Sequence, residues 1–322
     1  MPRFFDLLTL ALAEGQPFAL GIISDIKGSS PQKKGAKALF FADGRILGTL
    51  GGGCLEAEIQ DRARRALQTQ TPAKFELVLD HDFGWDDGLI CGGKVEGLIL
   101  PGAAQAGQLW RQIASLARTR TWGVREDYSI AWAEGPTGTE WLYVETVTPP
   151  CEMWIAGSGH VAQAVAPLAL QVDFQVTVFD DRPTLANRKY FPDGVRFRVD
   201  YWDNLLREPM PTQPVFGLIV TRGHQHDALV LKEWVHRPFV FLGLIGSRRK
   251  ARLIFGQFLE DHLATAAELA PVACPVGLDI GAQSVPEIAV SVLAQFIQRR
   301  AEKVFGRTLK GFGPVDLAAH ER

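Results

Sequence analysis

The second half of the sequence alternates short apolar runs with segments that have the periodicity of a helix. The apolar runs are MWIA, FQVTVFD, VRFRVD, VFGLIVT and FVFLGLIG. Most of them lack the polar alternation of a strand with one face in water, and helical segments separate them. This pattern is typical of a parallel sheet covered by helices on both faces. It predicts a Rossmann-like α/β domain with a doubly wound parallel sheet over residues 149–322.

The first half is predicted to be a separate mixed α/β domain, residues 1–148. The motif VTPPCE separates the two halves, because consecutive prolines interrupt regular structure and favour an extended linker. Within the first half, PFALGIISDI, ALFFA and KFELVLD read as strands, and CLEAEIQDRARRALQ reads as a helix. The dipeptide Asp43-Gly44 predicts a hairpin turn between ALFFA and RILGTL.

Charge and cysteine content restrict the class of protein. Lys plus Arg number 34 against 36 Asp plus Glu, so neither nucleic acid nor an anionic membrane is an expected partner. The four cysteines are irregularly spaced, which favours free thiols in a reducing, cytoplasmic compartment. The segment around LLTLALAEG resembles the apolar region of a signal peptide, but Asp6 and the single positive charge ahead of it argue against one. The helical spacing of its apolar residues favours an amphipathic helix instead. No apolar run approaches the roughly 20 residues that span a bilayer.

A nucleotide-binding fingerprint opens the second domain. Gly157 and Gly159 follow a strand and precede a helix that begins near His160, an arrangement that lets the backbone approach a pyrophosphate. The next strand ends in Asp180 and Asp181, where this fold places the acid that binds a ribose. The alternative interpretation is a turn that only packs.

Two further loops follow strands of the same predicted sheet. TRGHQHD contributes Arg222 and His224, and GSRRK contributes Ser247, as a helix N-cap, and Arg248. Because the carboxyl ends of parallel strands share one edge of a sheet, we expect these four residues to converge with the fingerprint on a phosphate-binding cleft. Taken singly, each side chain could equally cap a helix or face water.

Three consecutive glycines precede a cysteine in the first domain. Gly51, Gly52 and Gly53 can adopt positive φ, and the helix predicted to follow would point its N–H groups at an anion. A thiol at that position, Cys54, should have a lowered pKa and could contact a metal or sulfur. Cys91 with Gly92 repeats the arrangement. Buried structural thiols are the alternative, and we assign that role to Cys151 and Cys274.

Two polar loops in the first domain have more ambiguous patterns. KGSSPQKKGAK offers Ser29, Ser30, Lys33, Lys34 and Lys37 either as a second anion binder or as a solvated connection. HDFGWDDG contains His81 and three aspartates, but their spacing fixes no metal coordination shell, so a polar loop is favoured.

Taken in order, these motifs resemble the XdhC/CoxI family of xanthine dehydrogenase accessory proteins. The resemblance runs through GSSPQKKGAKALFFADGRILGTLGGGCLEAEI, CGGKVEGLIL, GSGHVAQAVAPLA, VTVFDDR, TRGHQHD, GLIGSRRKA and PVGLDIGAQSVPEIAVSVLAQFI, and so covers nearly the whole chain. It departs from the family at Lys33 and Lys34, which are more charged than usual, and at Ser158, where alanine is common.

The resemblance implies a chaperone and not an enzyme with its own turnover. Such proteins bind the molybdenum cofactor, a pterin dithiolene that carries molybdenum, with or without an attached nucleotide. They protect it while a cysteine desulfurase adds a sulfido ligand, and they deliver it to an apo-molybdoenzyme of the xanthine dehydrogenase type. A cofactor-synthesis or nucleotidyltransferase protein would supply the cofactor, and a homodimer is plausible. Carried over, Cys54 and Cys91 are the thiols that would contact the cofactor and its molybdenum.

Two other functions fit part of the sequence. An NAD(P)-dependent oxidoreductase would use the fingerprint and Asp180 alone, although the first domain supplies no evident proton donor. A regulatory module that senses a nucleotide would not need Cys54 or Cys91 for the maturation of a partner.

Overall fold

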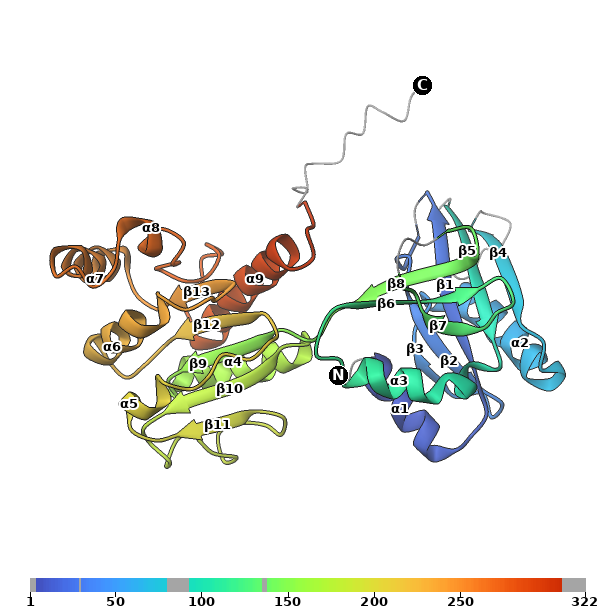
Figure 1. Cartoon of the computed structure of the whole chain (residues 1–322), viewed down its shortest axis with the longest axis horizontal. Helices are drawn as coiled ribbons and strands as arrows, with labels where there is room; N and C mark the ends of the chain where they lie inside the picture. The colour runs from blue at the N-terminus through green and yellow to red at the C-terminus, as the bar shows by residue number, and fades with distance from the viewer. Residues whose placement is uncertain (1–3, 29, 80–92, 135–137, 309–322) are drawn as a thin grey trace, which may run out of the picture. The chain divides into compact units, whose positions relative to one another are not determined.

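The computed structural model describes residues 4–28, 30–79, 93–134 and 138–308 (Figure 1). The chain divides into two compact units, with the boundary between Pro149 and Pro150. Each unit is described by itself.

The described residues of the N-terminal unit form two antiparallel sheets and three α-helices. The larger sheet has the order β3-β2-β1-β5-β4 and the smaller one the order β7-β6-β8. The strands are β1 (Phe18–Lys27), β2 (Lys37–Phe41), β3 (Ile46–Gly48), β4 (Ala73–Leu79), β5 (Gly93–Leu100), β6 (Arg120–Arg125), β7 (Ile130–Trp132) and β8 (Trp141–Val147). The helices are α1 (Phe4–Glu14), α2 (Gly53–Thr69) and α3 (Gly107–Ala114), with a 3-10 turn at Ala103–Ala106.

Both faces of the larger sheet are covered. Helix α2 packs Leu55, Ile59 and Ala63 on one face. Helices α1 and α3 and the smaller sheet cover the other, where Trp110 and Trp122 meet edge to face at 4.9 Å. The predicted hairpin is confirmed: Gly44 has φ 90°, and β2 and β3 pair across it. The helix predicted at the N-terminus is also confirmed as α1.

The strands described in the C-terminal unit form a parallel sheet in the order β11-β10-β9-β12-β13, which confirms the predicted fold class. The strands are β9 (Glu152–Ala156), β10 (Gln175–Asp180), β11 (Arg196–Val199), β12 (Val215–Ile219) and β13 (Phe241–Leu244). The helices are α4 (His160–Gln171), α5 (Trp202–Leu205), α6 (His224–Trp234), α7 (Arg248–Glu260), α8 (Ala266–Leu269) and α9 (Val285–Lys303).

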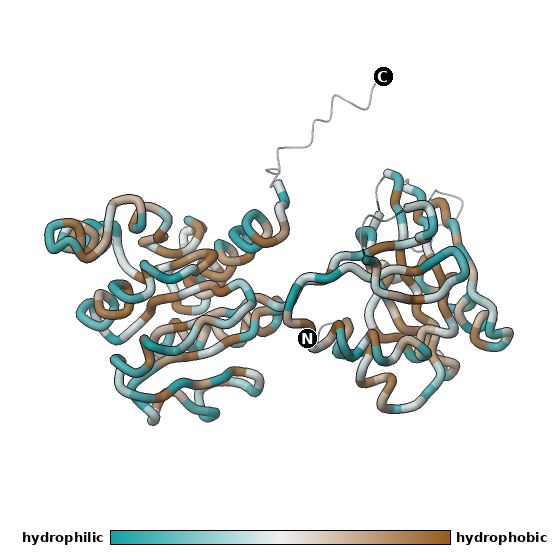
Figure 2. Tube along the Cα trace, in the orientation of Figure 1, coloured by the Kyte–Doolittle hydropathy of each residue, from teal (hydrophilic) through white to brown (hydrophobic). Residues whose placement is uncertain are grey.

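Alternate residues of each central strand face opposite layers of helices, which explains the continuous apolar runs. Met153 and Ile155 pack against α4 and α9, whereas Trp154 and Ala156 pack against α5 to α8. Figure 2 shows the hydrophobic residues concentrated along the strands of this sheet. Helix α9 begins with a capping box formed by Ser284 and Glu287. Among the helices that the structure describes, none is both long and apolar enough to cross a membrane.

Candidate functional site

The strand order of the C-terminal unit places a topological switch point between β9 and β12. The chain leaves β9 toward β10 on one side and returns to β12 on the other. Ligands in open α/β folds bind at such a point, outside the carboxyl ends of the strands. The fingerprint, the loop after β10, the loop after β12 and the loop after β13 all lie at this edge.

Gly157 makes the first turn of this edge possible. Its φ is 115°, and its N–H donates a hydrogen bond of 2.8 Å to the carbonyl of Phe179. A Cβ here would lie only 2.3 Å from the carbonyl oxygen of Val220. Only glycine therefore allows the β9–α4 turn to pass this close to the backbone that continues from β12.

Asp180 is buried and holds the fingerprint loop in place. Its carboxylate accepts hydrogen bonds from the N–H and the hydroxyl of Ser158, both at 2.7 Å. It also accepts three from Arg182, through the backbone N–H, Nε and Nη2, at 2.8 to 2.9 Å. Burial alone would raise the pKa of Asp180, but the bonds from Arg182 and Ser158 outweigh it and lower that pKa.

Asp180 has a structural role that its position in the sequence did not predict. With five donors around it and 1% of the residue exposed, the carboxylate positions the loop. Its role as a ribose ligand stays a prediction. The contacts also explain why serine occupies position 158: its buried hydroxyl donates to Asp180 and so fixes the turn at the end of β10.

An ion pair joins the loops that follow β10 and β12. Arg222 Nη2 lies 2.8 Å from Asp181 Oδ2, and the same atom donates to His226 Nε2 at 2.9 Å. The two predicted residues Asp181 and Arg222 therefore meet. Because their charges compensate each other, Arg222 adds less positive charge to this edge than the sequence suggested.

Asp227 was missed by the sequence analysis and is a second buried clamp. Its carboxylate accepts hydrogen bonds from the Thr221 N–H at 3.0 Å and the Thr221 hydroxyl at 2.6 Å, and it pairs with Lys250 Nζ. Lys250 also donates to the carbonyl of Ile245 at 2.9 Å. Asp227 thus ties the loop after β12 to the loop after β13. A signal existed: Asp227 begins the buried stripe of α6 that continues through Val230, Leu231 and Trp234.

The remaining predicted residues of this edge lie at helix starts. His160 is exposed at the first position of α4, and Gly159 is its N-cap. Ser247 caps α7 as predicted, because its hydroxyl accepts from the Lys250 N–H. His224 and Ser247 line a hollow of about 640 Å³ beside α7, and Arg248 is exposed at the first position of that helix.

In the N-terminal unit, the glycine run has the conformation that the sequence predicts. Gly51, Gly52 and Gly53 have φ of 129°, 72° and 56°. Glu56, in the first turn of α2, closes the loop by accepting from the Thr49 hydroxyl at 2.8 Å and the Leu50 N–H at 2.9 Å.

The start of α2 offers backbone N–H groups to a ligand. Space is open where a Cβ of Gly52 or Gly53 would lie, and the first N–H groups of a helix have no acceptor within the helix. This geometry suits an anion. Cys54 is the second residue of α2. Its side chain, and all of Cys91, Gly92 and the HDFGWDDG loop, lie outside what the structure describes.

The loop before β2 contacts the glycine run, but one predicted anion ligand is used elsewhere. Pro31 packs where a Cβ of Gly51 would lie, at 2.8 Å, while Lys33 and Lys34 are exposed. Lys37 fits neither of the two alternatives for this loop, an anion ligand or a solvated side chain. Its side chain is only 6% exposed and forms an ion pair with Glu145 at 2.7 Å.

Lys37 instead belongs to a buried polar cluster between the two sheets. Its ammonium donates to the carbonyl of Gly35 at 2.7 Å and lies 5.5 Å from the ring of Phe5. Burial lowers the pKa of Lys37 even though Glu145 opposes the shift. Burial raises the pKa of Tyr143, and the charge of Glu145 raises it further. The cluster holds the end of the loop that contacts the glycine run.

The structural role assigned to two cysteines agrees with their surroundings. Burial raises the pKa of Cys151 to about 11 and also raises that of Cys274. Both thiols are therefore protonated at neutral pH and poorly nucleophilic. Within the described ranges, no three His, Cys, Asp or Glu side chains gather in a way that could hold a metal ion.

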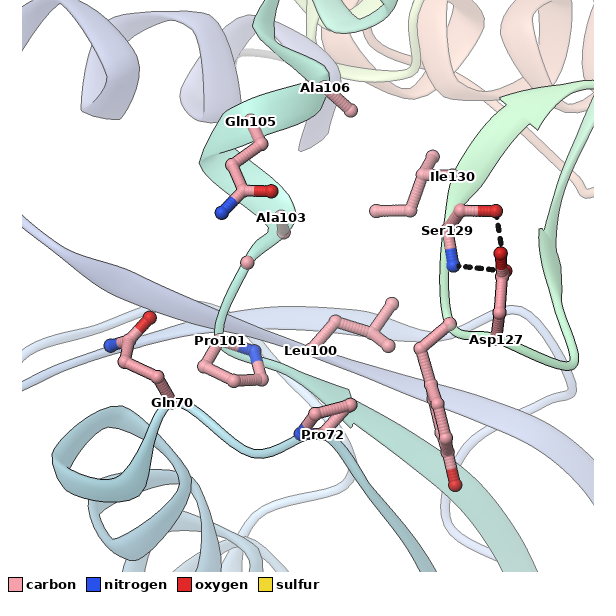
Figure 3. A pocket seen from close by; sticks show the side chains of 12 residues that line it. Gln70, Pro72, Leu100, Pro101, Ala103, Gln105, Ala106, Asp127, Ser129 and Ile130 are labelled. Carbon is pink, nitrogen blue, oxygen red and sulfur yellow. Dashed lines mark hydrogen bonds between the residues drawn. The ribbon is translucent and has the colours of Figure 1, made fainter.

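A separate pocket of about 470 Å³ lies in the N-terminal unit between Gln70, Pro101, Gln105 and Ile130 (Figure 3). Asp127 at its margin is engaged by the N–H and hydroxyl of Ser129, at 2.9 and 2.6 Å. The lining contains no cationic side chain and none of the predicted site residues. This pocket therefore does not suit a phosphate.

Comparisons with known proteins agree over most of the chain. The model of the XdhC and CoxI family matches residues 11–80, and that of the XdhC Rossmann domain matches residues 153–296. A protein of Bacillus subtilis that is described as a probable component of xanthine dehydrogenase is 25% identical, over 93% of this chain and 98% of that protein. The molybdenum cofactor insertion chaperone PaoD of Escherichia coli is 25% identical, over 88% of this chain and 84% of that protein.

Two further matches extend the comparison. The uncharacterized protein YqeB of Escherichia coli is 27% identical over 92% of this chain, which spans only 46% of YqeB, about half its length. A crystal structure described as a xanthine dehydrogenase from Bacillus halodurans has a TM-score of 0.79 and 25% identity, with 96% of this chain and 98% of that chain covered.

Proposed function

Because the chain belongs to the XdhC/CoxI family, we propose that it binds the molybdenum cofactor, protects it during sulfuration and delivers it to an apo-molybdoenzyme of the xanthine dehydrogenase type. Its similarity to a molybdenum cofactor insertion chaperone supports a role in the maturation of this cofactor. That similarity also favours a chaperone over an enzyme with its own turnover.

The observation that carries the proposal is the glycine run before α2. Gly51, Gly52 and Gly53 present open backbone at a helix start, which suits the anionic oxygen and sulfur atoms of the cofactor. We assign Cys54 and Cys91 as the thiols that contact the molybdenum or its sulfur, with Gly92 beside the second. The cofactor is cargo here, and the protein supplies binding and protection.

The edge of the C-terminal sheet is the proposed site for a phosphate or nucleotide portion. A pyrophosphate would lie against the fingerprint turn, at Gly157, Gly159 and His160. The loop after β13 would contribute Ser247 and Arg248. The loop after β12 would add Arg222 and His224 to this site. Asp180 positions the fingerprint turn through Ser158, and Asp181 positions Arg222. An NAD(P)-dependent oxidoreductase would use the same edge. The full engagement of Asp180 by Ser158 and Arg182 weighs against that alternative, because its carboxylate would have to be released to bind a ribose.

The proposed partners follow from the cargo. A cysteine desulfurase would add sulfur, a cofactor-synthesis or nucleotidyltransferase protein would supply the cofactor, and the apo-enzyme would receive it. We place this exchange in the cytoplasm. A homodimer is also part of the proposal.

Transfer of the cofactor tests this function. The protein is loaded anaerobically with sulfurated molybdenum cofactor and mixed with an apo-enzyme of the xanthine dehydrogenase type, and hydroxylase activity is followed. The wild type should activate the apo-enzyme well above free cofactor, and Cys54→Ser should lose most of that gain. Cys274→Ser is the matched control and should keep it. Equal activation with and without the protein would refute delivery.

A further inference from the structure

Helix α7 has an exposed face that carries opposite charges at its two ends and an apolar side chain and a glycine between them. Arg249, Leu253, Gly256 and Glu260 follow each other at spacings of four, three and four residues, so they line one side of the helix. Leu253 is 65% exposed, an unusual position for a large aliphatic side chain inside a basic segment. Space is open where a Cβ of Gly256 would lie.

The two charged residues of this face are unpaired within the part of the chain that the structure describes. Arg249 and Glu260 are exposed, and neither has an ion-pair partner among the described residues. They lie at opposite ends of the face, with Leu253 and Gly256 between them. The hollow of about 640 Å³ beside α7 is lined by all four residues.

The order of these residues fits an antiparallel copy of the same helix. If two α7 helices pack antiparallel about a twofold axis between Ile254 and Phe255, Leu253 faces Gly256 of the other copy. The same axis places Arg249 opposite Glu260. Each contact then occurs twice, as a twofold interface requires. Arg252 falls opposite Gln257, which can accept a hydrogen bond from it.

We propose that the exposed face of α7 is a homodimer interface, in which Leu253 of each copy fills the space above Gly256 of the other and Arg249 pairs with Glu260. The partner is a second copy of this chain, because charge and shape complement each other in the self-paired antiparallel register. This inference deepens the homodimer proposed above and does not depend on cofactor binding. One helix pair buries less than the roughly 1,600 Å² of a standard interface, so the association should be weak and reversible.

Charge exchange across the helix pair tests the interface. Sedimentation velocity of the full chain over about 1 to 500 µM covers the range expected of a weak interface. Arg249→Glu and Glu260→Arg should each weaken association by at least about tenfold, because each places like charges opposite one another at two positions. The double variant R249E/E260R restores opposite charges in the same register and should recover most of the wild-type association.

Two further variants separate this interface from other causes. Arg207→Glu changes an exposed arginine by the same charge away from α7 and should leave association unchanged. Leu253→Arg removes the apolar centre and should abolish the dimer, while circular dichroism checks that the fold is kept. A wild type that stays monomeric throughout, or a dimer that both single charge reversals leave intact, would overturn the proposal. Because the readout is self-association, such a result would leave the proposed cofactor binding unaffected.

Discussion

Replacing Gly157 with alanine should destabilise the C-terminal unit by at least about 3 kcal/mol. The new Cβ would lie 2.3 Å from the carbonyl oxygen of Val220, and φ of 115° is forbidden to an L residue with a side chain. Neither backbone can move easily, because both continue buried parallel strands. The variant should therefore either unfold this unit at lower denaturant concentration or displace the fingerprint turn.

Gly159→Ala is the matched control for this prediction. Its φ is −74°, and a Cβ there would contact nothing within 4 Å, so the change should cost less than about 1 kcal/mol. Urea unfolding followed by circular dichroism, together with calorimetry of both variants, gives the comparison. Equal stability of the two variants would show that the close approach between the turn and the end of β12 is not what requires glycine.

Replacing Glu145 with glutamine should destabilise the N-terminal unit by about 3 kcal/mol near neutral pH. Lys37 is 6% exposed and would keep its charge with no carboxylate beside it. The pKa of Lys37 is already lowered by burial, and the substitution should lower it further. At pH values between the pKa of Lys37 in the folded variant and the ordinary value of 10.5, the unfolded chain binds more protons than the folded one. The free energy of unfolding that the variant loses should therefore be regained as the pH rises through this range.

Two variants control the Glu145 prediction. Glu126→Gln removes an exposed carboxylate of the same unit and should change stability by no more than about 0.5 kcal/mol. Adding Lys37→Met to Glu145→Gln removes the unpaired buried charge and should recover much of the lost stability. The site should tolerate an apolar side chain, because Phe5 and Trp122 lie beside it. Thermal unfolding of all four proteins at several pH values measures the effect. If Glu145→Gln behaves like Glu126→Gln, the ion pair does not stabilise the unit.

The sequence predicts the architecture of the C-terminal unit well because its strands are buried on both faces. Continuous apolar runs such as VFGLIV leave little choice but a covered parallel sheet, and the ends of its strands locate the switch point. The hairpin at Asp43-Gly44 could be predicted for a different reason, because a tight turn depends only on residues that are neighbours in the sequence.

What the sequence could not predict are the partners of buried charges. Lys37 looks like its solvated neighbours Lys33 and Lys34, and its partner Glu145 is 108 residues away. Asp180 occupies the position of a ribose ligand, yet Ser158 and Arg182 occupy its oxygen atoms. Such pairings depend on how distant strands stack, which periodicity and spacing do not encode.

Equilibrium binding of the molybdenum cofactor tests the central claim most directly. Anaerobically prepared cofactor is titrated into the full chain and into Cys54→Ser and Cys91→Ser, with NADH titrated in parallel. We expect near-stoichiometric retention of the cofactor by the wild type, weaker retention by both cysteine variants and no saturable binding of NADH. Saturable binding of NADH without retention of the cofactor would contradict the chaperone function and favour an oxidoreductase.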